Sequence, residues 1–148
     1  MDERELRPPP PAPVVAVLAG GLGRRMGAAK AAVELAGRPL ISYPLRAAAE
    51  AGLPALVVAK SDSELPPLQA LVVREPDSPR HPLCGVLAAL RHVGAGKGEL
   101  WPCDGERDGR ERGVGDGRAV LAVACDMPFL GARLLAWMAA MGEVAVAT

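Results

Sequence analysis

The stretch LAGGLGRRMGAAK, from Leu18 to Lys30, gathers four glycines and three cations directly after the apolar run VVAV. Glycine is costly to order and clustered cations repel one another, so this composition calls for a compensating ligand. Glycines let a backbone approach phosphate groups closely and point its N–H groups at them. Arg25 and Lys30 add charge-assisted hydrogen bonds to phosphate oxygens. The stretch therefore predicts a loop that binds a polyanion, with a tight solvated turn carrying surface cations as the alternative.

The loop departs from two well-known phosphate-binding patterns. The P-loop requires a lysine followed by Ser or Thr, whereas Lys30 is followed by Ala31. The dinucleotide fingerprint G-x-G-x-x-G begins with Gly21 and Gly23 but has Met26 at its third glycine position. What remains is the longer pattern G-G-x-G-x-R-M-G-x-x-K, whose glycines and cations favour a ligand with a chain of phosphate groups.

Short apolar strands alternate with helices, which indicates an α/β fold with a mostly parallel sheet. The ligand site of such a sheet lies at the carboxyl ends of its strands. The glycine loop, Asp77 and Asp126 each follow a strand, so we expect them to converge on one edge. The expected strands are 14–19, 55–60, 71–75 and 119–130, with another beginning at 144–148; the expected helices are 41–52, 84–94 and 132–141, with a short helical turn within 61–70.

The 148 residues fit one domain, and half of them are apolar with only 3% aromatic, so the core must be aliphatic. Lys+Arg and Asp+Glu both number 17, which argues against a general nucleic-acid or membrane-surface binder.

The cysteines show no zinc-binding or disulfide pattern, which is typical of a protein of the cytoplasm. We expect residues 1–13 to form a disordered proline-rich leader, residues 14–148 to form the domain, and residues 94–118 to be a flexible insertion. No signal peptide or membrane span is predicted.

Three ordered motifs resemble the molybdenum cofactor guanylyltransferase family. They are LAGGLGRRMGAAK with the AGRPLI that follows it, PDSPRHPLCGVLAAL and ACDMPFL. The resemblance runs from Val14 to about Met138, leaving out 94–118, and it implies a three-layer, Rossmann-like nucleotidyltransferase fold. It also implies transfer of GMP from GTP to the phosphate of molybdopterin, with release of pyrophosphate.

By this resemblance, Leu18, Ala19 and Gly20 contact the base and ribose, and the loop through Gly21 and Gly23 holds the triphosphate with Arg25 and Lys30. Asp126 binds Mg²⁺ at the α-phosphate, where a hard cation prefers carboxylate oxygens. Arg25, Lys30 and Asp126 are thus the implied catalytic residues. Asp77 corresponds to the family's nucleotide-contacting acid, and Glu75 is a competing assignment.

The chain also departs from the family's pattern. Ala29 replaces the family's loop Asp, and the chain ends at Thr148, before the segment with which the family completes its sheet and holds the pterin. We therefore expect a C-terminally shortened sheet whose open edge is covered by a second copy or by a partner.

Other interpretations stay open at this point. Another base or phosphorylated acceptor, or a non-catalytic nucleotide-binding protein, fits the same motifs. His81 is either a phosphate donor or a loop residue without a role in the site. We expect Cys84, Cys125 and Trp137 to pack in the core.

Overall fold

The computed structural model describes residues 11–21, 29–94 and 118–141. Four parallel strands form its main sheet, in the order β5-β4-β1-β6. Their bounds are β1 Val14–Leu18, β4 Ala55–Ala59, β5 Leu71–Arg74 and β6 Val120–Ala124. The predicted α/β fold with a parallel sheet is confirmed.

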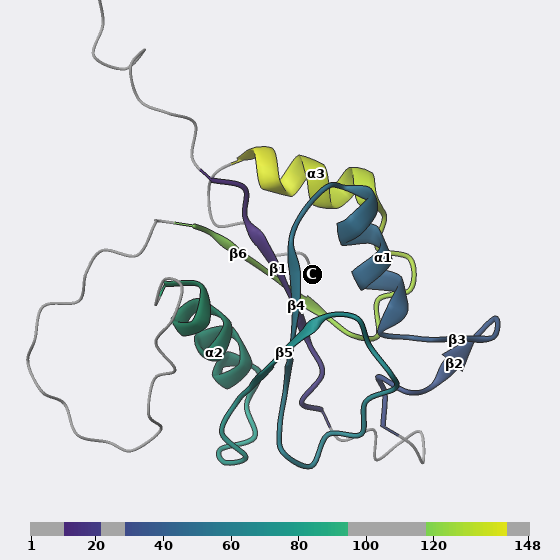
Figure 1. Cartoon of the computed structure of the whole chain (residues 1–148), viewed down its shortest axis with the longest axis vertical. Helices are drawn as coiled ribbons and strands as arrows, with labels where there is room; N and C mark the ends of the chain where they lie inside the picture. The colour runs from purple at the N-terminus through teal and green to yellow at the C-terminus, as the bar shows by residue number, and fades with distance from the viewer. Residues whose placement is uncertain (1–10, 22–28, 95–117, 142–148) are drawn as a thin grey trace, which may run out of the picture.

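Helices cover both faces of the sheet, which gives three layers (Figure 1). Helices α1 (Ser42–Glu50) and α3 (Ala132–Met141) pack on one face, and α2 (Pro82–Gly94) packs on the other. Side chains alternate between the two faces along each strand. In β1, Val15 and Val17 pack into the core beneath α1 and α3, whereas Val14 and Ala16 pack into the core beneath α2. Burial on both faces explains why the two central strands, β1 and β4, are continuous apolar runs.

The helices agree closely with the sequence expectation. Pro44 lies in the first turn of α1, where its missing N–H costs no hydrogen bond. Gly52, at φ +69°, ends that helix in the left-handed conformation that glycine adopts without strain. Helix α2 begins at Pro82, two residues before the predicted start.

The prediction that Trp137 packs in the core is wrong. Helix α3 buries Leu135 and Met138 against the sheet. Trp137 lies on the opposite face of the helix with Leu134 and Met141, and it is 59% exposed. A helix that packs on a sheet buries one stripe of side chains. Both faces of α3 are apolar, so the sequence did not indicate which face is buried.

Two further expectations are corrected. The predicted strand 119–130 is shorter, because β6 ends at Ala124 and the chain then turns, with Leu130 N–H donating to Met127 O at 3.2 Å. No helical turn forms within 61–70. An antiparallel hairpin of β2 (Glu34–Leu35) and β3 (Arg38–Pro39) was not predicted.

The expected strand at 144–148, nearly all of the insertion at 94–118 and most of the leader lie outside the described residues, so the predicted domain boundaries stay predictions. Within the described part of the chain, no helix is both long and apolar enough to cross a membrane.

Candidate nucleotide site

The carboxyl ends of the four parallel strands form a row along one edge of the sheet (Figure 1). Backbone hydrogen bonds continue the pairing just past the strand ends, from Ala19 N–H to Val58 O at 2.7 Å and from Glu75 N–H to Ala59 O at 3.0 Å. On the other side of β1, Cys125 N–H donates to Leu18 O at 3.2 Å. The residues that follow the strands are therefore held in register: Gly20 after β1, Lys60 after β4, Glu75 after β5 and Asp126 after β6.

Lys30 and Asp126 meet at one end of this row. The ammonium Nζ of Lys30 donates to Oδ2 of Asp126 at 2.8 Å, across 96 residues of sequence. Both side chains remain partly exposed, at 41% and 33%. The structure thus places the last cation of the glycine loop against the acid that follows β6. A phosphate group beside this pair would meet a cation, and a metal ion would meet a carboxylate.

Lys60 and Glu75 form a second ion pair, which is buried. Their Nζ and Oε1 atoms lie 3.5 Å apart, with only 3% and 6% of the side chains exposed. Lys60 Nζ also donates to the carbonyl of Pro76 at 2.5 Å. The second carboxylate oxygen of Glu75, Oε2, is buried and has no hydrogen-bond partner among the described residues. Glu75 was predicted only as a competing assignment for the nucleotide-contacting acid, and Lys60 was not predicted as a site residue.

The glycine loop begins directly over this buried pair. A Cβ atom added to Gly20 would lie 1.9 Å from Glu75 Oε1 and 3.4 Å from Lys60 Cγ. A Cβ atom added to Gly85, in the first turns of α2, would lie 3.2 Å from Glu75 Oε2. Glycine at both positions lets backbone approach the carboxylate from two sides.

Asp77, which the sequence favours as the nucleotide-contacting acid, is hydrogen-bonded to Ser61. Its carboxylate accepts from the Ser61 hydroxyl at 2.6 Å and from Ser61 N–H at 2.9 Å. These hydrogen bonds hold the pKa of Asp77 below its ordinary value. Asp77 therefore ties the loop after β4 to the loop after β5, and its contact with nucleotide stays a prediction.

The remaining expected site residues divide by position. Leu18, Ala19, Gly20 and Gly21 lie at the end of β1, whereas Gly23 and Arg25 lie outside the described residues. His81 is exposed, and its Nδ1 accepts from Leu83 N–H at 3.2 Å at the start of α2. This hydrogen bond satisfies a backbone N–H in the first turn of α2, so His81 helps to fix the start of the helix.

Cys125 directly precedes Asp126 and is buried, as expected. Burial, together with the neighbouring Asp126 carboxylate, raises the pKa of its thiol to about 11. The thiol stays protonated near neutral pH, so Cys125 is not a nucleophile here.

A metal ion at this site would depend on the ligand for most of its oxygens. Among the described residues, no three His, Cys, Asp or Glu side chains gather closely enough to hold a metal. Mg²⁺ is commonly held by one or two carboxylates plus substrate phosphates. The single carboxylate of Asp126, beside Lys30 of the predicted phosphate-binding loop, fits that kind of site.

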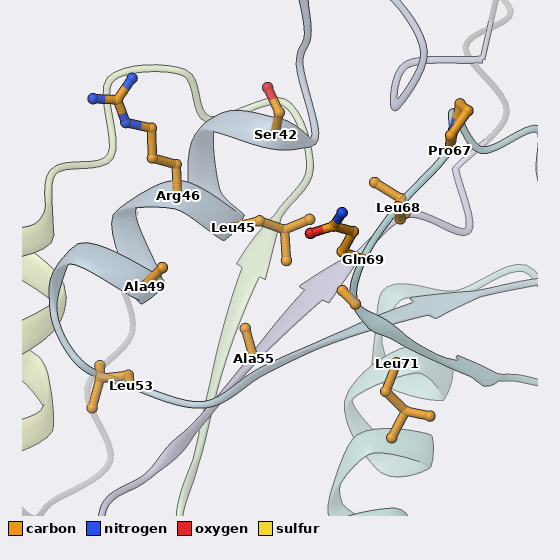
Figure 2. Close-up of a pocket in the computed structure, with 11 residues that line it drawn as sticks. Ser42, Leu45, Arg46, Ala49, Leu53, Ala55, Pro67, Leu68, Gln69 and Leu71 are labelled. Carbon is orange, nitrogen blue, oxygen red and sulfur yellow. The ribbon is translucent and has the colours of Figure 1, made fainter.

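A separate apolar groove of about 500 Å³ lies between α1 and the segment before β5 (Figure 2). Leu45 of α1 points toward Leu68 and Gln69 across it. Ala55 and Leu71, the first residues of β4 and β5, also line it, so it reaches the amino ends of these strands. None of the strand-end residues described above lines this groove, which is therefore distinct from the candidate site.

A three-layer fold with a parallel sheet, and with Lys30 and Asp126 in contact at the carboxyl edge, is typical of nucleotide-binding α/β proteins. Residues 15–148 match the family model described as the MobA-like NTP transferase domain, and the chain belongs to this family of nucleotidyltransferases. No curated protein matches the chain.

The solved structures that are similar to this chain include the following two. A hypothetical transferase from Thermus thermophilus matches with a TM-score of 0.59 and 25% identity, over 89% of this chain and 47% of that one. Rv0371c from Mycobacterium tuberculosis H37Rv matches with a TM-score of 0.54 and 16% identity, over 88% of this chain and 60% of that one. The chain thus spans about half the length of the first and three fifths of the second.

Proposed function

We propose that the chain is a Mg²⁺-dependent guanylyltransferase that transfers GMP from GTP to the terminal phosphate of molybdopterin and releases pyrophosphate. The observation that carries this proposal is the 2.8 Å contact between Lys30 and Asp126. It joins the lysine that would bind the phosphates to the acid that would hold the metal ion.

The proposed reaction relies on positioning and on charge stabilisation, with little covalent catalysis by the protein. The acceptor phosphate is already ionised at neutral pH, so no general base is required. The protein's contribution is to hold the acceptor in line with the α-phosphorus. Lys30, with Arg25 of the loop, neutralises the charge that develops on the triphosphate. Mg²⁺ held by Asp126 would supply Lewis-acid stabilisation of the same charge.

Membership of the family supports nucleotide transfer, and the ordered motifs with their LAGG loop support GTP and molybdopterin. Another nucleotide or another phosphorylated acceptor fits the same geometry. The titrations and the pyrophosphate assay described next distinguish these alternatives from GTP and molybdopterin. No nucleic-acid or membrane partner is proposed.

Calorimetric titration of the full chain with GTP, CTP and ATP, with and without Mg²⁺, is the first test. The proposal expects GTP to bind most tightly and Mg²⁺ to strengthen its binding. The second test is release of pyrophosphate from GTP when molybdopterin is added. The transferase proposal fails if no nucleotide binds, and the proposed acceptor fails if GTP binds but molybdopterin produces no pyrophosphate.

A further inference from the structure

We propose that Glu75 is a positioning residue, which supports the glycine loop from the sheet side and sets the path of the loop for the triphosphate. This inference rests on the proposed function and adds to it a residue that acts through Gly20, without touching the nucleotide. The carboxylate of Glu75 is the support, and the buried ammonium group of Lys60 holds that carboxylate in place.

The Glu75 carboxylate is held in a fixed position. Lys60 Nζ lies 3.5 Å from Glu75 Oε1 and donates to Pro76 O at 2.5 Å. The backbone of Lys60 is held as well, because its N–H donates to Ser63 Oγ at 3.0 Å and its carbonyl accepts from Arg74 at 2.5 Å. Both side chains of the ion pair are almost fully buried. The carboxylate therefore cannot turn away from its position without breaking a buried ion pair, which is strongly unfavourable.

Gly20 rests directly on this carboxylate. The pairing of β1 with β4 extends to Ala19, whose N–H donates to Val58 O at 2.7 Å, and Gly20 is the next residue. A Cβ atom at Gly20 would lie only 1.9 Å from Glu75 Oε1, so the backbone packs against the carboxylate with no room for a side chain between them. The carboxylate thus limits how closely the start of the loop can approach the sheet.

The second oxygen of the same carboxylate faces α2. A Cβ atom at Gly85 would lie 3.2 Å from Glu75 Oε2. Glu75 therefore contacts the glycine loop through one oxygen and the first turns of α2 through the other. The length of its side chain fixes how these two segments are spaced.

The energetic cost of this arrangement favours a functional role for Glu75. Its Oε2 atom is buried and has no hydrogen-bond partner among the described residues. A buried polar atom without a partner destabilises the fold. Apolar side chains of similar volume are often as stabilising as a buried ion pair, or more so. Stability alone therefore does not account for a glutamate here, whereas a rigid, ion-paired spacer beneath a binding loop does.

The path of the loop matters for the proposed reaction because the loop is predicted to hold the phosphate groups. The N–H groups of a glycine-rich turn bind phosphate oxygens only when they point at them. A misplacement of about 1 Å in a group that positions substrate can lower the rate by about 100-fold. A shorter support at position 75 should therefore slow transfer in the bound complex more than it weakens binding of GTP.

The test measures kcat and KM for GTP, from pyrophosphate release with molybdopterin, in variants of the full chain. Glu75→Asp keeps the charge but ends one methylene group short, and it should lower kcat by about 10–100-fold while KM changes by less than about threefold. Lys60→Met combined with Glu75→Gln removes both charges but keeps the length of the spacer. This combined variant should keep kcat within about threefold of the wild-type value.

The second part of the test combines Gly20→Ala with Glu75→Asp. Gly20→Ala alone should lower kcat, because the added methyl group must displace the carboxylate or the loop. The shorter acid leaves room for that methyl group, so the combined variant should regain at least about tenfold in kcat over Gly20→Ala alone. Gly131→Ala is the matched control, since a Cβ atom there meets nothing within 4 Å, and it should rescue nothing in Glu75→Asp.

Rescue in the combined variant, with the change in kcat and not in KM, supports the positioning role. A merely structural contact would change the free energy of unfolding in urea and leave kcat of the folded protein unchanged, and that result overturns the inference. A combined variant as slow as its two single effects predict also overturns it, as does a folded Lys60→Met, Glu75→Gln variant that has lost its turnover. If that charge-free variant does not fold, Glu75→Asp and its combination with Gly20→Ala still decide the question.

The wild-type chain separates this inference from the proposed function. Wild-type turnover of GTP without coupling between positions 20 and 75 leaves the proposed function standing and ends the inference alone. Absence of wild-type turnover ends both.

Discussion

Gly20 lies so close to Glu75 that a Cβ atom at position 20 would come within 1.9 Å of the Glu75 Oε1 atom. The contact joins the start of the glycine loop to the buried ion pair at the ends of β4 and β5. Any side chain at position 20 must displace the carboxylate or lift the loop.

Gly20→Ala should therefore lower the free energy of unfolding by about 1–3 kcal/mol, the usual range for overpacking a buried site. We expect Glu75 to be the group that moves, because the nearest atom is the end of a side chain and not backbone. Urea denaturation measures the loss. Gly21→Ala is the matched control, since a Cβ atom there meets nothing within 4 Å and should leave stability nearly unchanged. Equal stability of the two variants would contradict the close contact.

Asp126→Ala should abolish Mg²⁺-dependent turnover and weaken GTP binding only modestly. The ion pair that it removes is partly exposed, so the free energy of unfolding should change by no more than about 1 kcal/mol. Pyrophosphate release and calorimetry with and without Mg²⁺ check the first expectation, and urea denaturation checks the second. Turnover that remains Mg²⁺-dependent in this variant would refute the metal role of Asp126.

Asp77→Asn should make the chain less stable near neutral pH, with the difference from wild type fading in acid. The Ser61 hydrogen bonds lower the pKa of Asp77 in the folded state. Their contribution is therefore fully present above the unfolded value of about 4 and is lost as the pH falls through the lower folded pKa. Urea denaturation of both proteins at pH 6 and below pH 4 measures this. A difference that persists undiminished in acid would show that the carboxylate charge is not what Ser61 recognises.

Cys125 should resist alkylation by iodoacetamide at pH 8. Its thiol pKa of about 11 leaves little thiolate at that pH, and burial restricts access. The measurement uses a Cys84→Ser, Cys103→Ser variant, in which Cys125 is the remaining thiol. Labelling should become rapid once the chain is unfolded in urea. Fast labelling of the folded variant would mean that the segment around Asp126 opens readily.

The main sheet and its helices could be predicted because each strand is a continuous apolar run and each helix is bounded by recognisable residues. The hairpin at 34–39 could not, because its strands have two residues each and its turn holds Ala36 at φ +51° beside Gly37. Alanine seldom adopts that conformation, so its presence there gives no signal. The predicted strand at 119–130 was too long because the turn after Ala124 is itself partly buried and apolar.

The Lys30–Asp126 pair was foreseeable in outline, since both residues belong to motifs that follow strands. The Lys60–Glu75 pair was not, because neither residue stands in a distinctive motif. Their contact depends on β4 and β5 being parallel neighbours paired from Leu56 with Leu71 to Ala59 with Arg74. A charged residue just after a strand looks like an ordinary loop residue until the adjacent strand is known.

The 2.8 Å contact of Lys30 with Asp126 also bears on the order in which ligands arrive. The Lys30 ammonium already contacts Oδ2 of Asp126, so if Asp126 holds the metal as proposed, a bare Mg²⁺ ion would compete with Lys30 for this oxygen. The phosphates of a nucleotide that already carries Mg²⁺ would attract Lys30 away from Asp126 and so lessen that competition. For the proposed reaction we therefore expect the metal and the nucleotide to bind together.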